Sequence, residues 1–141
     1  RRYSVENGWG YDGSAAAVLG LTDAASRNLL ERCRNSHRAY RFPATWGPNY
    51  DWHPDMTHGG NLMSTAQLML LQNVGRRILL LPAWPPAWDV SFRLHAPGAV
   101  VEGEVRGGRL RRLVVEPGSR RGDVEICPPF GDGGRSPGEG K

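Results

Sequence analysis

The sequence predicts an α+β protein in which helices come first and strands follow. Three observations predict this order: apolar residues recur at helical spacing in the first half, the periodicity changes at Arg76, and apolar and polar residues then alternate. We therefore expect helices over residues 1–75 and a small antiparallel sheet or sandwich over residues 76–130. Gly, Pro and charged residues dominate 131–141, where we expect a disordered tail.

The first helices are defined by their caps. Ser14 is suited to cap a helix from Ala15 to Leu19, with Gly20 as its C-cap. After a short link, Thr22 can cap a longer helix from Asp23 to His37, and the two helices should form an αα-hairpin.

The longer helix carries a predicted buried stripe. Ala25, Leu29, Cys33 and His37 recur at every fourth residue. We expect Cys33 to be a small buried thiol, and Cys33 and Cys127 to form neither a disulfide nor a zinc site.

The stretch from Thr45 to Asn61 is the most site-like part of the chain. Its prolines and glycines interrupt regular structure, so we expect a loop. Asn61 is a suitable N-cap for a buried helix from Leu62 to Val74 that ends at Gly75. An ordered connection this long inside a domain is usually functional.

Strands are expected in the second half of the chain. The segments that predict them are Ile78–Leu81, Val90–Leu94, Val101–Val105, Leu113–Val115 and Val124–Ile126. Gly107-Gly108 should form a two-residue hairpin turn. Pro85 and Pro86 should form another turn, between the two halves of the chain, that presents Trp84 and Trp88; for these, packing at the domain interface is favoured over ligand contact.

Composition narrows the class of partner. The net charge is +4 and Lys141 is the only lysine. The arginines are dispersed along the chain, whereas nucleic-acid surfaces gather cations, so we expect no nucleic-acid partner. No apolar run is long enough to span a membrane, and we expect no membrane association. Because the chain begins with Arg1, we expect a processed or truncated piece, with localisation open and a periplasmic or secreted parent as one option.

Two successive motifs resemble a known enzyme family. The segment from Gly60 to Gln72 (Gly-Asn-Leu-Met-Ser-Thr-Ala-Gln-Leu-Met-Leu-Leu-Gln), followed by Ile78 to Pro85 (Ile-Leu-Leu-Leu-Pro-Ala-Trp-Pro) and Trp88, is similar to the C-terminal region of family 95 of the glycoside hydrolases. The resemblance covers roughly residues 46–126. It implies the terminal helices of an (α/α) barrel, a closing β domain, and inverting hydrolysis of α-linked fucose or galactose-like sugars. An oligosaccharide or glycoside would be the partner, together with a missing N-terminal part of the same polypeptide.

The resemblance also implies catalytic positions. In the family an aspartate precedes the Gly-Asn pair, but here Gly59 occupies that position. Asp55 or His58, on the same stretch, can supply the water-activating group instead. The family's general acid lies upstream and has no clear match, Glu6 being a weak candidate.

The remaining site candidates would contact sugar. Asp51, Trp52, His53 and Asn61 can bond or stack on a sugar ring, and Trp46 can do so or pack. The spacing of His53, Asp55 and His58 also suits a metal, but without a helix to fix it we expect no metal and no cofactor. A non-catalytic carbohydrate-binding module or a purely structural module remains the alternative to an enzyme.

Overall fold

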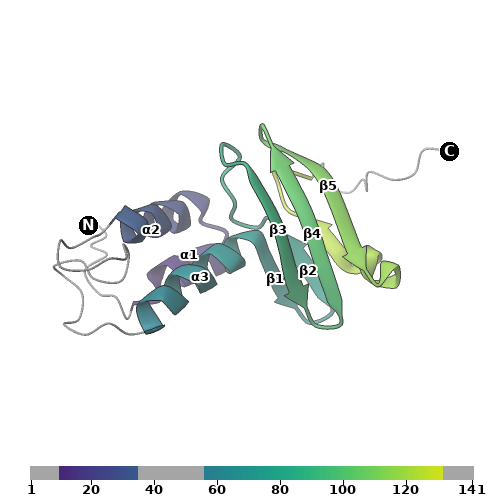
Figure 1. Ribbon diagram of the computed structural model, residues 1–141, viewed down its shortest axis with the longest axis horizontal. Coiled ribbons are helices and arrows are strands. Elements are labelled where there is room, and N and C mark those ends of the chain that lie inside the picture. Colours follow the sequence, from purple (N-terminus) through teal and green to yellow (C-terminus); the bar gives the residue numbers. More distant parts are fainter. Residues whose placement is uncertain (1–9, 35–55, 132–141) are drawn as a thin grey trace. The chain divides into compact units, whose positions relative to one another are not determined.

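The computed structural model describes residues 10–34 and 56–131, with side chains described from Gly59 onward in the second range. The chain divides into two compact units, Arg1–Met69 and Leu70–Lys141. The described part is mixed α+β, with helices in the first unit and two small sheets in the second (Figure 1). The predicted fold class is confirmed at that level.

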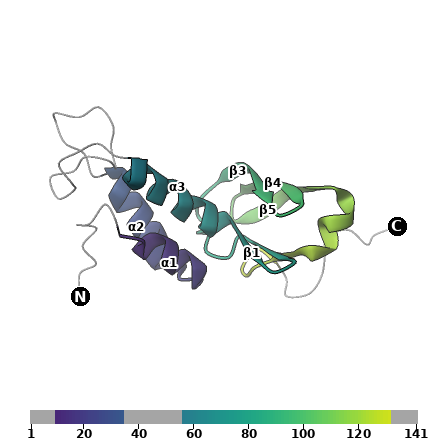
Figure 2. The same cartoon turned by 90° about the horizontal axis from the view of Figure 1, so that it is seen from below.

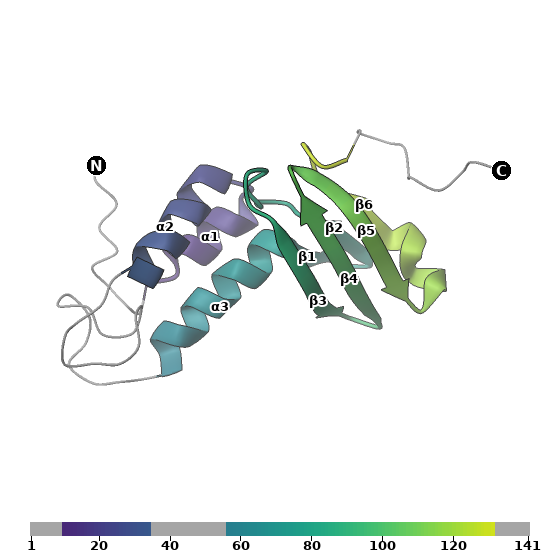
Figure 3. The same cartoon turned by 45° about the horizontal axis from the view of Figure 1, so that its top comes forward.

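The helical unit contains α1 (Asp12–Val18), α2 (Thr22–Arg34) and α3 (Met56–Leu70). The link between α1 and α2 ends the first helix with a glycine in the left-handed conformation. Gly20 has φ +70°, the Leu21 N–H donates to the Ala16 carbonyl (2.9 Å) and the Gly20 N–H to that of Ala17 (3.0 Å). These two bonds satisfy the last carbonyls of α1 and turn the chain back, so the predicted αα-hairpin and its Gly20 cap are confirmed (Figure 3).

Several details of the first two helices differ from prediction. α1 starts at Asp12, so Ser14 lies inside it and is not its N-cap. Cys33 is exposed, whereas its neighbour Arg32 is buried. A strict four-residue repeat drifts around a helix that turns every 3.6 residues. The buried stripe therefore runs through Ala25, Asn28, Leu29 and Arg32.

α3 also has different ends. It begins at Met56, so Asn61 lies inside the helix and is not an N-cap. It ends at Leu70, because Leu71–Val74 forms strand β1, which pairs with β2 (Arg77–Leu80) in an antiparallel hairpin. Gly75, at φ +61°, lies in the turn of that hairpin rather than at a helix end. The predicted helix from Leu62 to Val74 is therefore wrong for its last four residues, which gain more from pairing with β2 than from continuing the helix.

The β unit has two three-stranded sheets. The first sheet has the strand order β1–β2–β6, with β6 at Val124–Ile126. The second sheet has the order β3–β4–β5, formed by β3 (Val90–Ala96), β4 (Ala99–Arg106) and β5 (Arg109–Glu116). Figure 2 shows the sheets as two layers. A purely antiparallel sheet was predicted, but β2 and β6 pair in parallel. The crossover that a parallel partner requires runs from β2 through the whole second sheet and the 3₁₀ helix η1 (Gly118–Asp123) to β6.

Alternation along β4 builds much of the core between the layers. Val101 and Val105 are fully buried, as are Ile78 and Leu80 on β2. Between the two valines, Gly103 leaves room for a ring: a Cβ there would lie 2.2 Å from Cζ of Phe92 on β3. The aromatic ring thus fills the space above a strand glycine.

Arg120 of η1 fastens three segments of the β unit. Its guanidinium donates to Asp123 Oδ2 (2.6 Å), to the Pro97 carbonyl (2.7 Å) and to the Arg76 carbonyl (3.1 Å). The Arg76 side chain also reaches Asp123, at 3.1 Å. The hydrogen bond from Arg76, then that from Arg120, holds the pKa of Asp123 below its ordinary value despite some desolvation.

The proline turn is a packing element. Trp84 is buried, its indole N–H donates to the Trp88 carbonyl (2.9 Å), and the two rings meet edge to face with centroids 5.4 Å apart. Both tryptophans therefore pack against each other within the β unit. Leu81, just before Pro82, has φ +60° and is 1% exposed, a strained backbone position for a branched residue.

Candidate functional site

Most of the predicted site lies outside the described residues. Trp46, Asp51, Trp52, His53 and Asp55 all fall within 35–55, and Glu6 falls within 1–9. His58 lies in α3, where only its backbone is described. Asn61 is the one predicted site residue whose side chain is described.

Asn61 is one helical turn after His58 and is 6% exposed. Its carbonyl accepts a hydrogen bond from the Thr65 hydroxyl at 2.8 Å. The Thr65 oxygen lies 3.1 Å from that of Ser14 on α1. Since the single Thr65 proton is used toward Asn61, the Ser14 hydroxyl is the donor in this pair. Asn61 therefore belongs to a polar contact between α1 and α3.

A second polar contact joins α2 to Gly10, which precedes α1 in the chain. The Arg32 Nε donates to the Asn28 side-chain oxygen (3.0 Å), and its Nη2 donates to the Gly10 carbonyl (2.7 Å). Arg32 is 2% exposed and Asn28 8% exposed. A guanidinium this buried is costly unless its donors are satisfied, so the cluster fixes the chain around Gly10.

Gly13 lies where these two contacts meet. A Cβ at this position would lie 2.5 Å from Asn28 Oδ1 and 2.9 Å from Thr65 Oγ1. The absent side chain is what allows α1 to approach both α2 and α3. The interior of the helical unit thus combines a polar network with close backbone packing, where an apolar core would be the ordinary arrangement.

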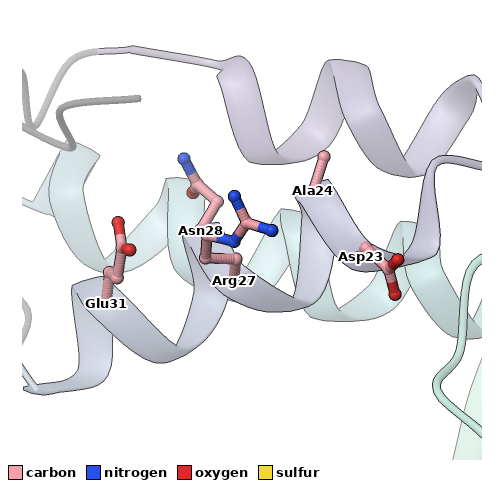
Figure 4. A pocket seen from close by; sticks show the side chains of 5 residues that line it. All are labelled: Asp23, Ala24, Arg27, Asn28 and Glu31. Carbon is pink, nitrogen blue, oxygen red and sulfur yellow. The ribbon is translucent and has the colours of Figure 1, made fainter. Parts of the chain in front are cut away.

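A small pocket of about 170 Å³ lies along α2, lined by Asp23, Ala24, Arg27, Asn28 and Glu31 (Figure 4). Its volume is below that of an ordinary small-molecule site. Two carboxylates, a guanidinium and an amide can together hydrogen-bond a water cluster or a single polar group. By itself this pocket does not define a substrate.

Other chemistry is limited in the described ranges. No group of three or more His, Cys, Asp or Glu side chains there is arranged to hold a metal ion. No helix of residues 10–34 or 56–131 is long and apolar enough to cross a membrane. Partial desolvation raises the pKa of the Cys33 thiol although the residue is exposed, and burial followed by the charge of Glu125 raises the pKa of Cys127. Neither thiol is thus activated as a nucleophile.

Sequence reasoning missed the roles of Arg32, Asn28 and Thr65. Arg32 and Asn28 lie four residues apart on the face that also carries Ala25, and this spacing was the available signal. The role of Thr65 depends on α3 packing against α1, which no local pattern shows.

Searches for similar proteins found no match for this chain among protein-family models, curated proteins or solved structures.

Proposed function

We propose that this chain is part of a carbohydrate-active enzyme, the C-terminal portion of a glycoside hydrolase similar to family 95. It would act on α-linked fucose or galactose-like sugars with inversion. The observation that supports the proposal best is the order of elements over the two motifs. The Gly-Asn motif lies in α3, and the leucine-proline-alanine motif begins in β2 and leads into the second sheet. A family 95-like helical barrel followed by a closing β domain requires the same order.

The proposed catalytic base is Asp55, with His58 as the alternative. Asp55 is the residue that precedes the first residue of α3 in the sequence. The positive end of a helix stabilises a nearby carboxylate in its ionised form, which is the form that activates water. His58 would do the same work as a neutral imidazole near neutral pH. The leaving oxygen needs a separate general acid, held far enough away to admit the water.

The proposed sugar contacts are Asp51, Trp52, His53, Asn61 and Trp46. Aromatic rings stack on the apolar face of a sugar, while carboxylate, imidazole and amide groups bind its hydroxyls. For Asn61, the bond from Thr65 to its carbonyl supports a fixed position in α3. Thr65 in turn meets Ser14, so the polar network would stabilise this wall of the site from behind.

A second function is favoured by one specific observation. Gly59 stands where the family pattern has its catalytic aspartate. A chain that lost this carboxylate without replacing it would bind sugar and leave it intact. The second candidate is therefore a non-catalytic carbohydrate-binding module of the same fold.

The test combines binding and turnover. L-fucose, galactose and their α-linked disaccharides are titrated calorimetrically into the chain, and into any longer polypeptide that contains it, while released sugar is measured. The wild type is compared with Asp55→Asn. Turnover that collapses in the variant while binding survives supports Asp55 as the base. Binding without turnover in the wild type favours the binding module, and the absence of both rejects the carbohydrate proposal.

A further inference from the structure

The outer face of the β3–β4–β5 sheet carries an unusual set of arginines near the β4–β5 turn. Arg106, the last residue of β4, is directly opposite Arg109, the first residue of β5. Directly opposed side chains on a sheet lie about 5 Å apart at Cβ, and like charges at this separation destabilise the pair. The turn between them, Gly107-Gly108, has φ +56° and +70° and holds this register.

A β-bulge adds a third and a fourth arginine to the same face. Glu104 pairs with Arg112 and Val105 pairs with Leu110, so Arg111 has no residue opposite it. The extra residue lets Leu110 and Leu113 both turn toward the core although they are three positions apart. Arg111 and Arg112 are consequently both exposed.

The acidic residues of this face neutralise only part of the charge. Glu102 contacts Arg112 (3.1 Å) and Arg93 (3.5 Å), and Glu104 contacts Arg106 (3.1 Å). Arg106 also donates to the Ser91 hydroxyl on β3 (3.0 Å), which turns it away from Arg109. Within residues 10–34 and 59–131, Arg109 and Arg111 have no ion pair or side-chain hydrogen bond. Three of the five arginines are paired with these two glutamates; Glu116, at the far end of β5, lies on the same face, and the Asp89 carboxylate accepts from the Gly107 N–H (2.8 Å) beside it.

We propose that this arginine face, defined as Arg93, Arg106, Arg109, Arg111 and Arg112, binds an anionic polysaccharide through its carboxylate or sulfate groups. Guanidinium groups bind both kinds of anion by paired hydrogen bonds. Arg109 and Arg111 make the principal contacts because their donors are free of other partners in the described structure.

The absence of exposed large apolar side chains on this sheet disfavours single-stranded nucleic acid and membrane surfaces as partners of the arginine face. All such side chains in the described ranges lie elsewhere, the nearest along the chain being Val74 on β1. Single-stranded nucleic acid is usually held by base stacking on aromatic rings, and membrane surfaces by inserted apolar residues. The choice of a polysaccharide as partner also depends on the proposed carbohydrate function, whereas the charge argument does not.

The test measures binding of the full chain to dextran sulfate and to polygalacturonate, with neutral dextran as the blank. Arg109→Gln/Arg111→Gln is compared with Arg27→Gln/Arg34→Gln, which removes the same charge from exposed positions of α2. We expect the first variant to bind about tenfold more weakly and its salt dependence to fall by about 1.5 in log–log slope, as expected for two lost contacts. The control should stay within about twofold of wild type. Binding of one polymer alone identifies sulfate or carboxylate as the group recognised.

Three results would overturn this proposal: binding of neither charged polymer, equal weakening in both double variants, or tighter binding of a single-stranded oligonucleotide than of either polymer. Thermal unfolding of the variants checks their fold, and removing Arg109 should leave the β unit at least as stable as wild type. Hydrolysis of a neutral α-fucoside is assayed in parallel, because it does not involve the arginine face. Loss of hydrolysis with retained polymer binding therefore rejects only the catalytic proposal.

Discussion

Replacing Gly13 by alanine should destabilise the helical unit, although alanine is the better helix former. The new methyl group would lie 2.5 Å from Asn28 Oδ1 and 2.9 Å from Thr65 Oγ1. Neither oxygen can retreat freely, because Asn28 accepts from the buried Arg32 and Thr65 is bonded to Asn61. α1 must therefore move away from α2 or α3, or one of these hydrogen bonds must break.

The size of the effect follows from two opposing contributions. Alanine gains about 0.5–1 kcal/mol over glycine in a helix. Overpacking costs about 1–3 kcal/mol, and disturbing the bond to the Arg32 guanidinium adds about 1.5–3 kcal/mol. The losses exceed the gain, so we expect Gly13→Ala to lower the free energy of unfolding by about 2 kcal/mol. With a urea dependence of about 1–3 kcal/mol per molar, the midpoint should fall by about 1 M.

The matched control is Gly60→Ala in α3, where an added Cβ meets no described atom within 4 Å. There the helix-propensity gain stands alone, and we expect stabilisation by about 0.5–1 kcal/mol. Urea unfolding is followed by far-ultraviolet circular dichroism, and amide exchange in α1 and α2 locates the change. A Gly13→Ala protein as stable as wild type would refute the close-packing argument.

Three further predictions concern the sheets and the site. Gly103→Ala should destabilise the β unit by about 1–3 kcal/mol through its clash with Phe92, and the same change in a Phe92→Ala background should cost less; equal urea-midpoint shifts in both backgrounds would contradict this. The hydrogen bond from Arg76 lowers the pKa of Asp123 in the folded state, so the stabilising effect of the ionised carboxylate should be complete above about pH 4 and decline as the pH falls further. Asp123→Asn should flatten this part of a curve of unfolding free energy against pH. An unchanged curve would argue against the role of Asp123. Gly59→Asp restores the family carboxylate at a position where a Cβ meets no described atom within 4 Å, so it should increase release of fucose from an α-linked substrate; no increase in a folded variant would count against the family alignment.

The β half followed from sequence because its signals are local. Alternation in Val90–Leu94 and Val101–Val105, and the Gly107-Gly108 turn, each specify strand, face and register within a few residues. The parallel pairing of β6 with β2 could not be predicted this way, since the two strands are more than forty residues apart and no hairpin joins them. The boundary between α3 and β1 was missed for a related reason. An apolar residue such as Leu71 suits a buried helix and a buried strand equally well, and only its pairing with Leu80 on β2 makes it part of a strand.

The candidate site was predicted from residue types alone, and the geometry of its one described side chain, Asn61, was not predicted. Asn61 was chosen as a site candidate from its residue type, but its place inside α3 was not predicted, because Gly59 and Gly60 suggested a loop. The buried Arg32 was missed because a charged residue near a helix end is ordinarily solvated. Its burial depends on a hydrogen bond to the carbonyl of Gly10, which precedes α1 in the chain, and the spacing of residues in the sequence does not reveal this contact.

The most direct test of the proposed activity is the stereochemistry of the released sugar. Proton NMR during hydrolysis of an α-L-fucoside distinguishes the two anomers before they equilibrate. An inverting acid–base mechanism predicts β-fucose as the first product of the wild type and loss of that signal in Asp55→Asn. Release of α-fucose, or β-fucose formed equally fast by the variant, would contradict the assignment of Asp55 as the base in an inverting hydrolase.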